Sequence, residues 1–296
     1  MGVYQGGDAR GYFTSDDVAW RIGRELALVL GGPRALLMQV AHPLVAAGVA
    51  VHSSYRDDPW RRLERTMNAV WSIVFGSREE ADEAAARVKA VHLTVRGRLE
   101  EPMGPFPAGT RYSALDPELM MWVHATLVDT ALLVYGSWVR PLSEEEQAAY
   151  YEEMKTLARL FGTPDDVIPR SLDAFRLYMA ERLSSGEIVV TEAAQRIAET
   201  VLRPPVPLAL RPLAEAVNLL TVSLLPERLR TGYGLSWDPA RAVLVAASRP
   251  WIRRVVLPLM PDLIRAVQAA RRAEGRRGQA LAKLLPSAQW PLPERN

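Results

Sequence analysis

The sequence has no cysteine among its 296 residues. Without cysteine the protein has no disulfides, thiolate zinc sites, iron–sulfur clusters, cysteine nucleophile or thiolate-ligated haem. Net charge is also small, because 36 basic residues oppose 34 acidic ones and leave +2. This balance gives no argument for nucleic acid as a partner.

Signals for export and for a membrane span are missing as well. The first residues, MGVYQGGDARGYFTSDD, are polar and have no apolar signal core. The most apolar run, residues 25–51, contains Arg34, a Gly-Gly-Pro break and a His-Pro pair, so each arm is shorter than the ~20 residues of a membrane helix. We expect a buried hairpin here, and a cytoplasmic protein with no transmembrane segment. Peripheral contact with a membrane stays open.

Several catalytic signatures are absent. The chain has no G-x-S-x-G, H-E-x-x-H, Walker or G-x-G-x-x-G motif. A helical di-iron site needs Glu-x-x-His on two helices, so that a carboxylate and an imidazole share a face. The residues three positions before the histidines are Gln39, Val49, Lys89 and Met121. None of them is acidic, so the usual di-iron pattern fails.

Helical signals dominate what is present. Apolar residues make up 49% of the chain, enough for a large core. Helix starts are indicated by Pro33, by residues 57–59, by Ser77 with Glu80, by residues 116–118 and by residues 143–146. Helices are expected over residues 77–99, 116–138, 143–162, 171–184, 191–203, 207–224, 238–248 and 259–273. The sequence therefore predicts one all-α domain of about ten helices over 12–270, then a basic, Pro-containing tail over 271–296.

The four histidines are His42, His52, His92 and His124. One neutral imidazole is enough to hold haem iron. In the helix expected over 77–99, an apolar arc is formed by Ala84, Val88, Val91, Val95 and Leu99, and His92 lies at its edge. Lys89 and Arg96 lie one turn away on the same side, where cations could bind haem propionates. The spacing equally allows a core-edge histidine bonded to a backbone carbonyl, with both cations solvated.

Two further groups of residues could contribute to such a pocket. Arg62, Arg65 and Thr66 share one side of the preceding helix, where a cation and a hydroxyl could steady bound dioxygen; a wet helix face is the alternative. His124 lies on an apolar helix. It could be a haem contact, a propionate partner or a buried structural histidine. His42 precedes Pro43 and is expected to bond a carbonyl freed by a kink there.

The order R-x-x-[KR]-T, then K-x-x-H-x-x-x-R on the next helix, resembles the latex clearing protein and MpaB oxygenase family. The two motifs are residues 62–66 and 89–96, and similar stretches at 41–59, 112–130 and 224–237 extend the likeness from about residue 12 to about residue 264. The resemblance implies an all-α fold holding haem b, with dioxygen as co-substrate and His92 as the axial iron ligand. It also places Arg62, Arg65 and Thr66 on the distal side.

Two positions depart from the rubber-cleaving branch, which has Lys where this chain has Arg65 and Arg where it has Lys89. Arginine is permanently charged, so distal ligation or acid–base work by a lysine is not carried over. The sequence thus predicts a haem-dependent oxygenase, an oxidoreductase acting on an apolar, isoprenoid-like small molecule, with Lys89, His92, Arg96 and His124 binding the cofactor. The alternatives are a non-catalytic haem or lipid-binding protein on the same fold, and a helical interaction module with a basic C-terminal segment.

Overall fold

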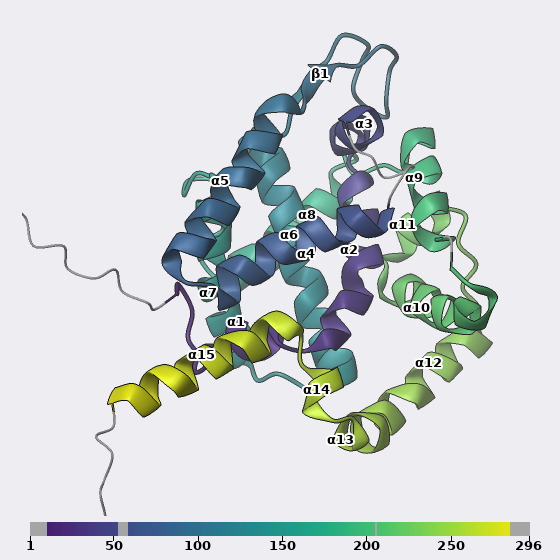
Figure 1. Cartoon of the computed structure of the whole chain (residues 1–296). Helices are drawn as coiled ribbons and strands as arrows, with labels where there is room; N and C mark the ends of the chain where they lie inside the picture. The colour runs from purple at the N-terminus through teal and green to yellow at the C-terminus, as the bar shows by residue number, and fades with distance from the viewer. Residues whose placement is uncertain (1–10, 53–58, 205, 285–296) are drawn as a thin grey trace, which may run out of the picture.

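The protein is nearly all-helical, as expected from its sequence. A computed structural model describes residues 11–52, 59–204 and 206–284. Helices pack around a long central helix, α6, and the described part of the chain adds one two-stranded sheet, β1 with β2 (Figure 1). The all-α fold class is confirmed.

The helices and strands have the following bounds. The first half comprises α1 (Val18–Gly23), the 3₁₀ helix η1 (Leu26–Gly31), α2 (Gly32–Val40), α3 (Pro43–His52), α4 (Pro59–Phe75), α5 (Arg78–Thr94), β1 (Arg96–Arg98), β2 (Arg111–Ser113) and α6 (Pro117–Val134) with its π-helical extension η2 (Tyr135–Val139). The second half comprises α7 (Glu144–Phe161), α8 (Leu172–Ser184), α9 (Glu192–Leu202), η3 (Leu208–Leu210), α10 (Arg211–Leu224), α11 (Glu227–Gly232), α12 (Pro239–Trp251), η4 (Ile252–Val256), α13 (Leu257–Leu259), α14 (Asp262–Arg265) and α15 (Gln268–Leu284).

Local capping signals set several helix ends as predicted. Ser77 with Glu80 and Ser143 with Glu146 form reciprocal capping boxes at the starts of α5 and α7. The Asp116 carboxylate accepts the first backbone N–H groups of α6. These capping interactions join residues within one helical turn, so the sequence alone predicts where they occur.

The apolar run at residues 25–51 is broken before Pro43, as predicted, into a first arm made of η1 and α2 and a second arm, α3. The axis from Leu26–Val40 to Pro43–His52 bends by 111°. Pro43 lacks the N–H that would continue α2, so a new helix begins there. In the described part of the chain, one helix, Pro117–Val139, is long and apolar enough to cross a membrane, and 61% of its apolar window is buried inside the protein.

The helix expected to reach Leu99 ends at Thr94 instead. The next residues, Arg96–Arg98, pair in antiparallel fashion with Arg111–Ser113, inside a segment expected to be a loop. Leu99 is buried in a satellite cluster with Tyr112. This burial, together with pairing to a strand 15 residues on, outweighs continuation of the helix. Arg96 therefore lies on β1 and not on the helix of His92.

The C-terminal region also differs from the expected pattern. Three helices, α13, α14 and α15, replace the single helix expected over 259–273, and α11 was not expected. Prolines 258 and 261 break the helical run, since neither supplies an N–H. α15 continues across the boundary expected at residue 271, with Ala270 and Ala273 buried in the main core.

Candidate functional site

His92 lies on the inward-facing stripe of α5. The buried residues of this helix are Ala81, Ala84 and Ala85, and His92 continues the same line at positions i+11, i+8 and i+7. Val91, expected in the apolar arc, is 60% exposed. Small alanines let α5 approach α4 and α7 closely, so the buried face runs through the alanines and not through the valines.

The His92 ring is set up to stay neutral. Its Nδ1 is buried with no hydrogen-bond partner in the described part of the chain. Burial lowers the pKa of His92 below its usual value, because the charged imidazolium loses solvation. The carbonyl-bonded histidine considered from the sequence is therefore not what these residues form. A neutral imidazole with an uncommitted nitrogen is the form that binds a metal.

Lys89 and Arg96 are close to His92 in the sequence, and the side chains of both are exposed. Lys89 is on α5, one turn before His92, and Arg96 follows the helix on β1. Neither is paired with a carboxylate in the described part of the chain. Both cations are thus free to meet an anionic group at the surface.

His124 is buried on α6 without any polar partner. It is 4% exposed, and both of its ring nitrogens lack a hydrogen bond among the described residues. Complete burial lowers the pKa of His124 to about 4. His124 shares a helix face with Leu127 and Ala131, which line the internal cavities described below. An unpaired buried imidazole of this kind costs free energy unless something else satisfies it.

α4 contributes the other residues that the sequence singled out. It contacts α5, and the two helices diverge from the turn that joins them, α5 toward β1 and α4 toward α2 (Figure 1). Arg65 is exposed. Thr66 lines a cavity. Arg62 lies on the same helix, and its side chain is outside the described residues.

A cavity of about 600 Å³ lies beside α4, and no charged side chain lines it. Its walls come from η1, α2, α4, α6, α9 and α10 and include Ala35, Thr66, Leu127 and Ala214. A smaller cavity of about 100 Å³ shares Thr66, Met67 and Leu127 with it and continues into the core. None of the four histidines lines either cavity. The cavity could not be located from the sequence, because its walls come from six segments that are separated along the chain.

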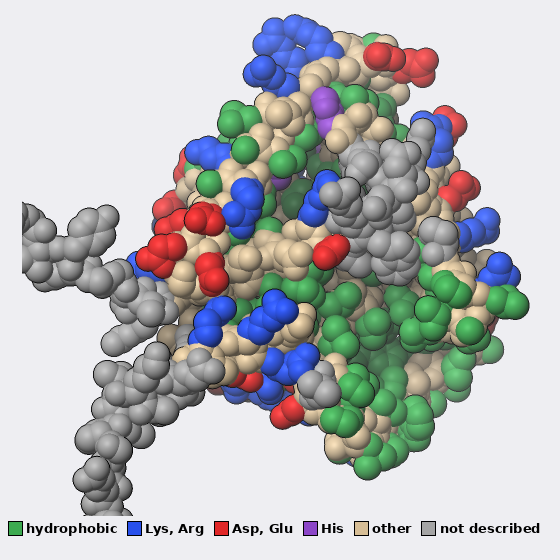
Figure 2. Space-filling model, in the orientation of Figure 1, with side chains coloured by type: hydrophobic (Ala, Val, Ile, Leu, Met, Phe, Trp, Pro, Cys, Tyr) green, Lys and Arg blue, Asp and Glu red, His purple; other side chains and the backbone are tan. Residues whose placement is uncertain are grey.

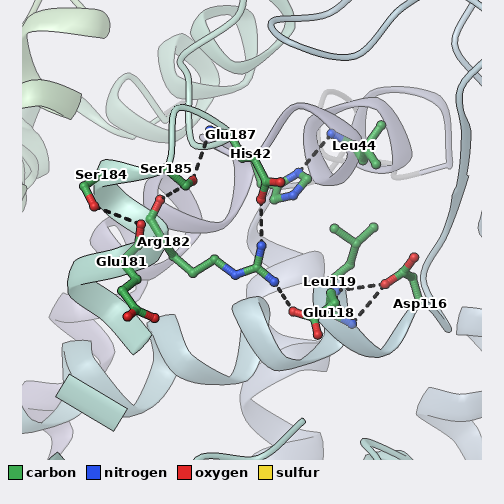
Figure 3. A network of polar contacts seen from close by, with 10 residues as sticks. All are labelled: His42, Leu44, Asp116, Glu118, Leu119, Glu181, Arg182, Ser184, Ser185 and Glu187. Carbon is green, nitrogen blue, oxygen red and sulfur yellow. Dashed lines mark hydrogen bonds and ion pairs between the residues drawn. The ribbon is translucent and has the colours of Figure 1, made fainter. Parts of the chain in front are cut away.

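The remaining two histidines have structural roles. The Nδ1 atom of His42 accepts a hydrogen bond from the Leu44 N–H at 3.2 Å, so the expected bond to a freed carbonyl is replaced by one to an amide. Figure 3 shows His42 beside a network in which Arg182 bridges Glu187 and Glu118. His52 is exposed and lies against Tyr112.

The residues present fit a haem b held by a single imidazole. A haem iron needs one nitrogen that the protein has not already used, and His92 supplies it on a buried stripe. Figure 2 shows histidine atoms in a recess of the surface beside α5. Among the described residues no group of three or more His, Asp or Glu could hold a metal ion.

The architecture defines an all-α protein with an apolar cavity, a buried His124 and a half-buried His92, whose buried ring nitrogens have no hydrogen-bond partner among the described residues. Residues 20–254 match the family model described as ER-bound oxygenase mpaB/B'/Rubber oxygenase, catalytic domain. The match covers well over half of the chain. The protein therefore belongs to the MpaB/rubber oxygenase family, and oxygenase chemistry is established at the level of that family.

Two curated relatives are similar over most of their length. They are uncharacterized protein Mb2261 of Mycobacterium bovis and uncharacterized protein Rv2237 of Mycobacterium tuberculosis. Each is 28% identical over 219 residues, which cover 70% of this chain and 80% of the relative. No solved structure matches the chain.

Proposed function

We propose that the protein is a haem-dependent oxygenase in which His92 is the axial ligand. The observation that carries this proposal is the buried Nδ1 of His92 on the inward stripe of α5, which has no hydrogen-bond partner among the described residues. The family assignment supports it, since the matching model describes an oxygenase catalytic domain. When bound, the haem supplies the one-electron chemistry that lets dioxygen react with a carbon–carbon double bond.

The chain's own residues would hold and orient the cofactor. His92 would bind the iron as a neutral imidazole, since its lowered pKa keeps it unprotonated at neutral pH. Lys89 and Arg96 would pair with the propionates at the surface. His124 would form part of the buried wall, or receive a hydrogen-bonding group of the cofactor that its unpaired ring nitrogens lack.

The distal side would be formed by α4. Thr66 offers a hydroxyl at the wall of the large cavity, and Arg62 and Arg65 are carried on the same helix. A fixed cation or hydroxyl stabilises negative charge that develops on an oxygen atom. An arginine side chain does not exchange protons in proteins, so Arg65 would orient and stabilise a bound group and would not shuttle a proton.

The apolar cavity of about 600 Å³ is the proposed substrate site. Its uncharged lining favours a neutral, hydrophobic molecule such as an isoprenoid-like alkene. Four polar side chains in the lining, those of Gln39, Thr66, Thr200 and Asn218, could position one oxygen function of such a molecule.

Pyridine hemochrome analysis of freshly purified protein tests the proposal. We expect a haem b spectrum in the wild type and a loss of haem in His92→Ala. His52→Ala is the matched control, because His52 is exposed and lies outside the proposed site. Equal haem content in His92→Ala and the wild type would rule out the ligand assignment.

A carrier of haem or lipid is the second candidate, favoured by the large uncharged cavity. Dioxygen uptake by the reduced protein with an added isoprenoid alkene distinguishes the two functions. Carbonyl products formed with multiple turnovers support the oxygenase. Binding of the alkene without dioxygen uptake supports the carrier.

A further inference from the structure

One face of the molecule is covered by exposed hydrophobic side chains. We call it the apolar face, and it consists of Leu208, Leu210, Leu213, Val243, Leu244, Trp251, Val255 and Leu259. Each of these side chains is at least 40% exposed. Figure 2 shows the hydrophobic side chains gathered over α10, α12 and α13, with few charged groups among them. Contiguous apolar surface of this kind marks an interaction site.

The apolar face is continuous with the large cavity. Leu210 and Leu213 belong to both, because they line the cavity and are 49% and 61% exposed. Leu30 adds a third cavity residue that is 40% exposed. Figure 2 shows a hollow within this hydrophobic surface. The mouth of the cavity therefore opens on the apolar face, and a hydrophobic ligand could enter without first crossing charged surface.

The charges around the apolar face are mostly positive. Residues 203–265 contain nine arginines and only four acidic residues. Arg203 and Arg211 lie next to cavity-lining residues, and Arg254 lies next to Val255 of the apolar face. All three are exposed, and none is paired with a carboxylate in the described part of the chain. Exposed leucine and tryptophan flanked by arginine is the composition of a surface that rests in the headgroup region of an anionic bilayer.

We propose that the apolar face attaches the protein to an anionic membrane surface and admits a hydrophobic ligand from the bilayer directly into the cavity. A second copy of the chain fits this surface less well. A two-fold dimer through the same patch would bring the unpaired arginines of both copies together. A bilayer with anionic headgroups instead neutralises them. The attachment extends the proposed function, and its test needs neither haem nor turnover.

Vesicle flotation measures the attachment. The vesicles are phosphatidylcholine alone, or phosphatidylcholine with phosphatidylglycerol. We expect the wild-type protein to float with the mixed vesicles, and the double variant Leu213→Glu/Leu244→Glu to lose at least about tenfold in partitioning. Leu177→Glu is the matched control, because Leu177 is 59% exposed on α8, outside the apolar face. Circular dichroism confirms that each variant is folded.

A second pair of substitutions tests the electrostatic part. Arg203→Gln with Arg211→Gln should lower binding to the mixed vesicles by roughly fivefold for each arginine, and added salt should have the same effect. Equal flotation of the wild type and the double glutamate variant would overturn the proposal. So would a wild-type dimer that binds no vesicles and dissociates in Leu213→Glu, because the partner would then be a second copy. Either failure leaves the haem assignment untouched, since that assignment depends on the hemochrome spectrum.

Discussion

Arg34 of α2 is bound to Asp129 of α6 across the core, with Nη2 donating to Oδ2 at 2.7 Å. The Arg34 side chain is only 3% exposed, and it also donates to Thr130 Oγ1 and to the Leu224 carbonyl. Each of the three guanidinium nitrogens thus donates a hydrogen bond. Arg34 is the charged residue within the most apolar run of the sequence, and it links α2 to the central helix α6.

Removing the carboxylate should destabilise the fold. In Asp129→Ala the buried guanidinium keeps two neutral acceptors and loses its counter-charge. Because Asp129 is a quarter exposed, water offsets part of the loss, and we expect the free energy of unfolding to fall by about 2 kcal/mol. Urea denaturation measures this change. In the control, Glu83→Ala, an exposed pair with Arg87 is broken, and the expected change is below about 0.5 kcal/mol.

His42 should make the folded state sensitive to acid. Burial lowers its pKa to about 4, below the value near 6.5 of an exposed histidine. Between these two values the unfolded chain binds a proton that the folded chain does not, so stability falls as the pH drops from about 6.5 to about 4. The contribution of His42 over this window is about 3 kcal/mol.

His42→Asn isolates this contribution. The Asn amide oxygen can replace Nδ1 as acceptor for the Leu44 N–H, so folding is preserved. We expect a flatter dependence of the urea midpoint on pH than in the wild type. His124 contributes to the pH dependence of stability in both proteins, so its contribution cancels when the two pH profiles are subtracted. Identical pH profiles for the two proteins would contradict the buried, neutral assignment.

Filling the large cavity should block the hydrophobic ligand without disturbing the haem. Ala214 lines the cavity and is only partly buried, so Ala214→Trp can place its ring in the space. We expect at least tenfold weaker binding of a neutral apolar dye such as Nile red, with an unchanged hemochrome. Ala180→Trp on α8 is the control, since Ala180 is exposed outside the cavity. Unchanged dye affinity in Ala214→Trp would show that the cavity is not the binding site for hydrophobic ligands.

The sequence predicted the helix ends that depend on residues close together in the chain. Helix starts at Pro33, Ser77, Asp116 and Ser143 follow from caps within one turn, and the break before Pro43 follows from a missing N–H. The two family motifs lie on successive helices, with Thr66 on α4 and His92 on α5.

Features set by distant segments could not be predicted in this way. The N–H groups of Val18 and Ala19 at the start of α1 are bound by Glu153 of α7, more than 130 residues away in the sequence. The end of α5 depends on pairing with Arg111–Ser113, which moved Arg96 off the helix. The buried stripe of α5 follows alanines whose partners lie on other helices, so the exposure of Val91 could not be predicted, whereas His92 lies at the edge of the core as expected.

Imidazole rescue of His92→Gly tests whether His92 holds the haem iron. Glycine removes the ligand and leaves space on the buried stripe for a free imidazole, at a helix cost of about 1 kcal/mol. We expect His92→Gly to lose the wild-type Soret spectrum and millimolar imidazole to restore it during reconstitution with hemin. His52→Gly should need no rescue. A wild-type Soret spectrum in His92→Gly without imidazole would show that another residue holds the iron.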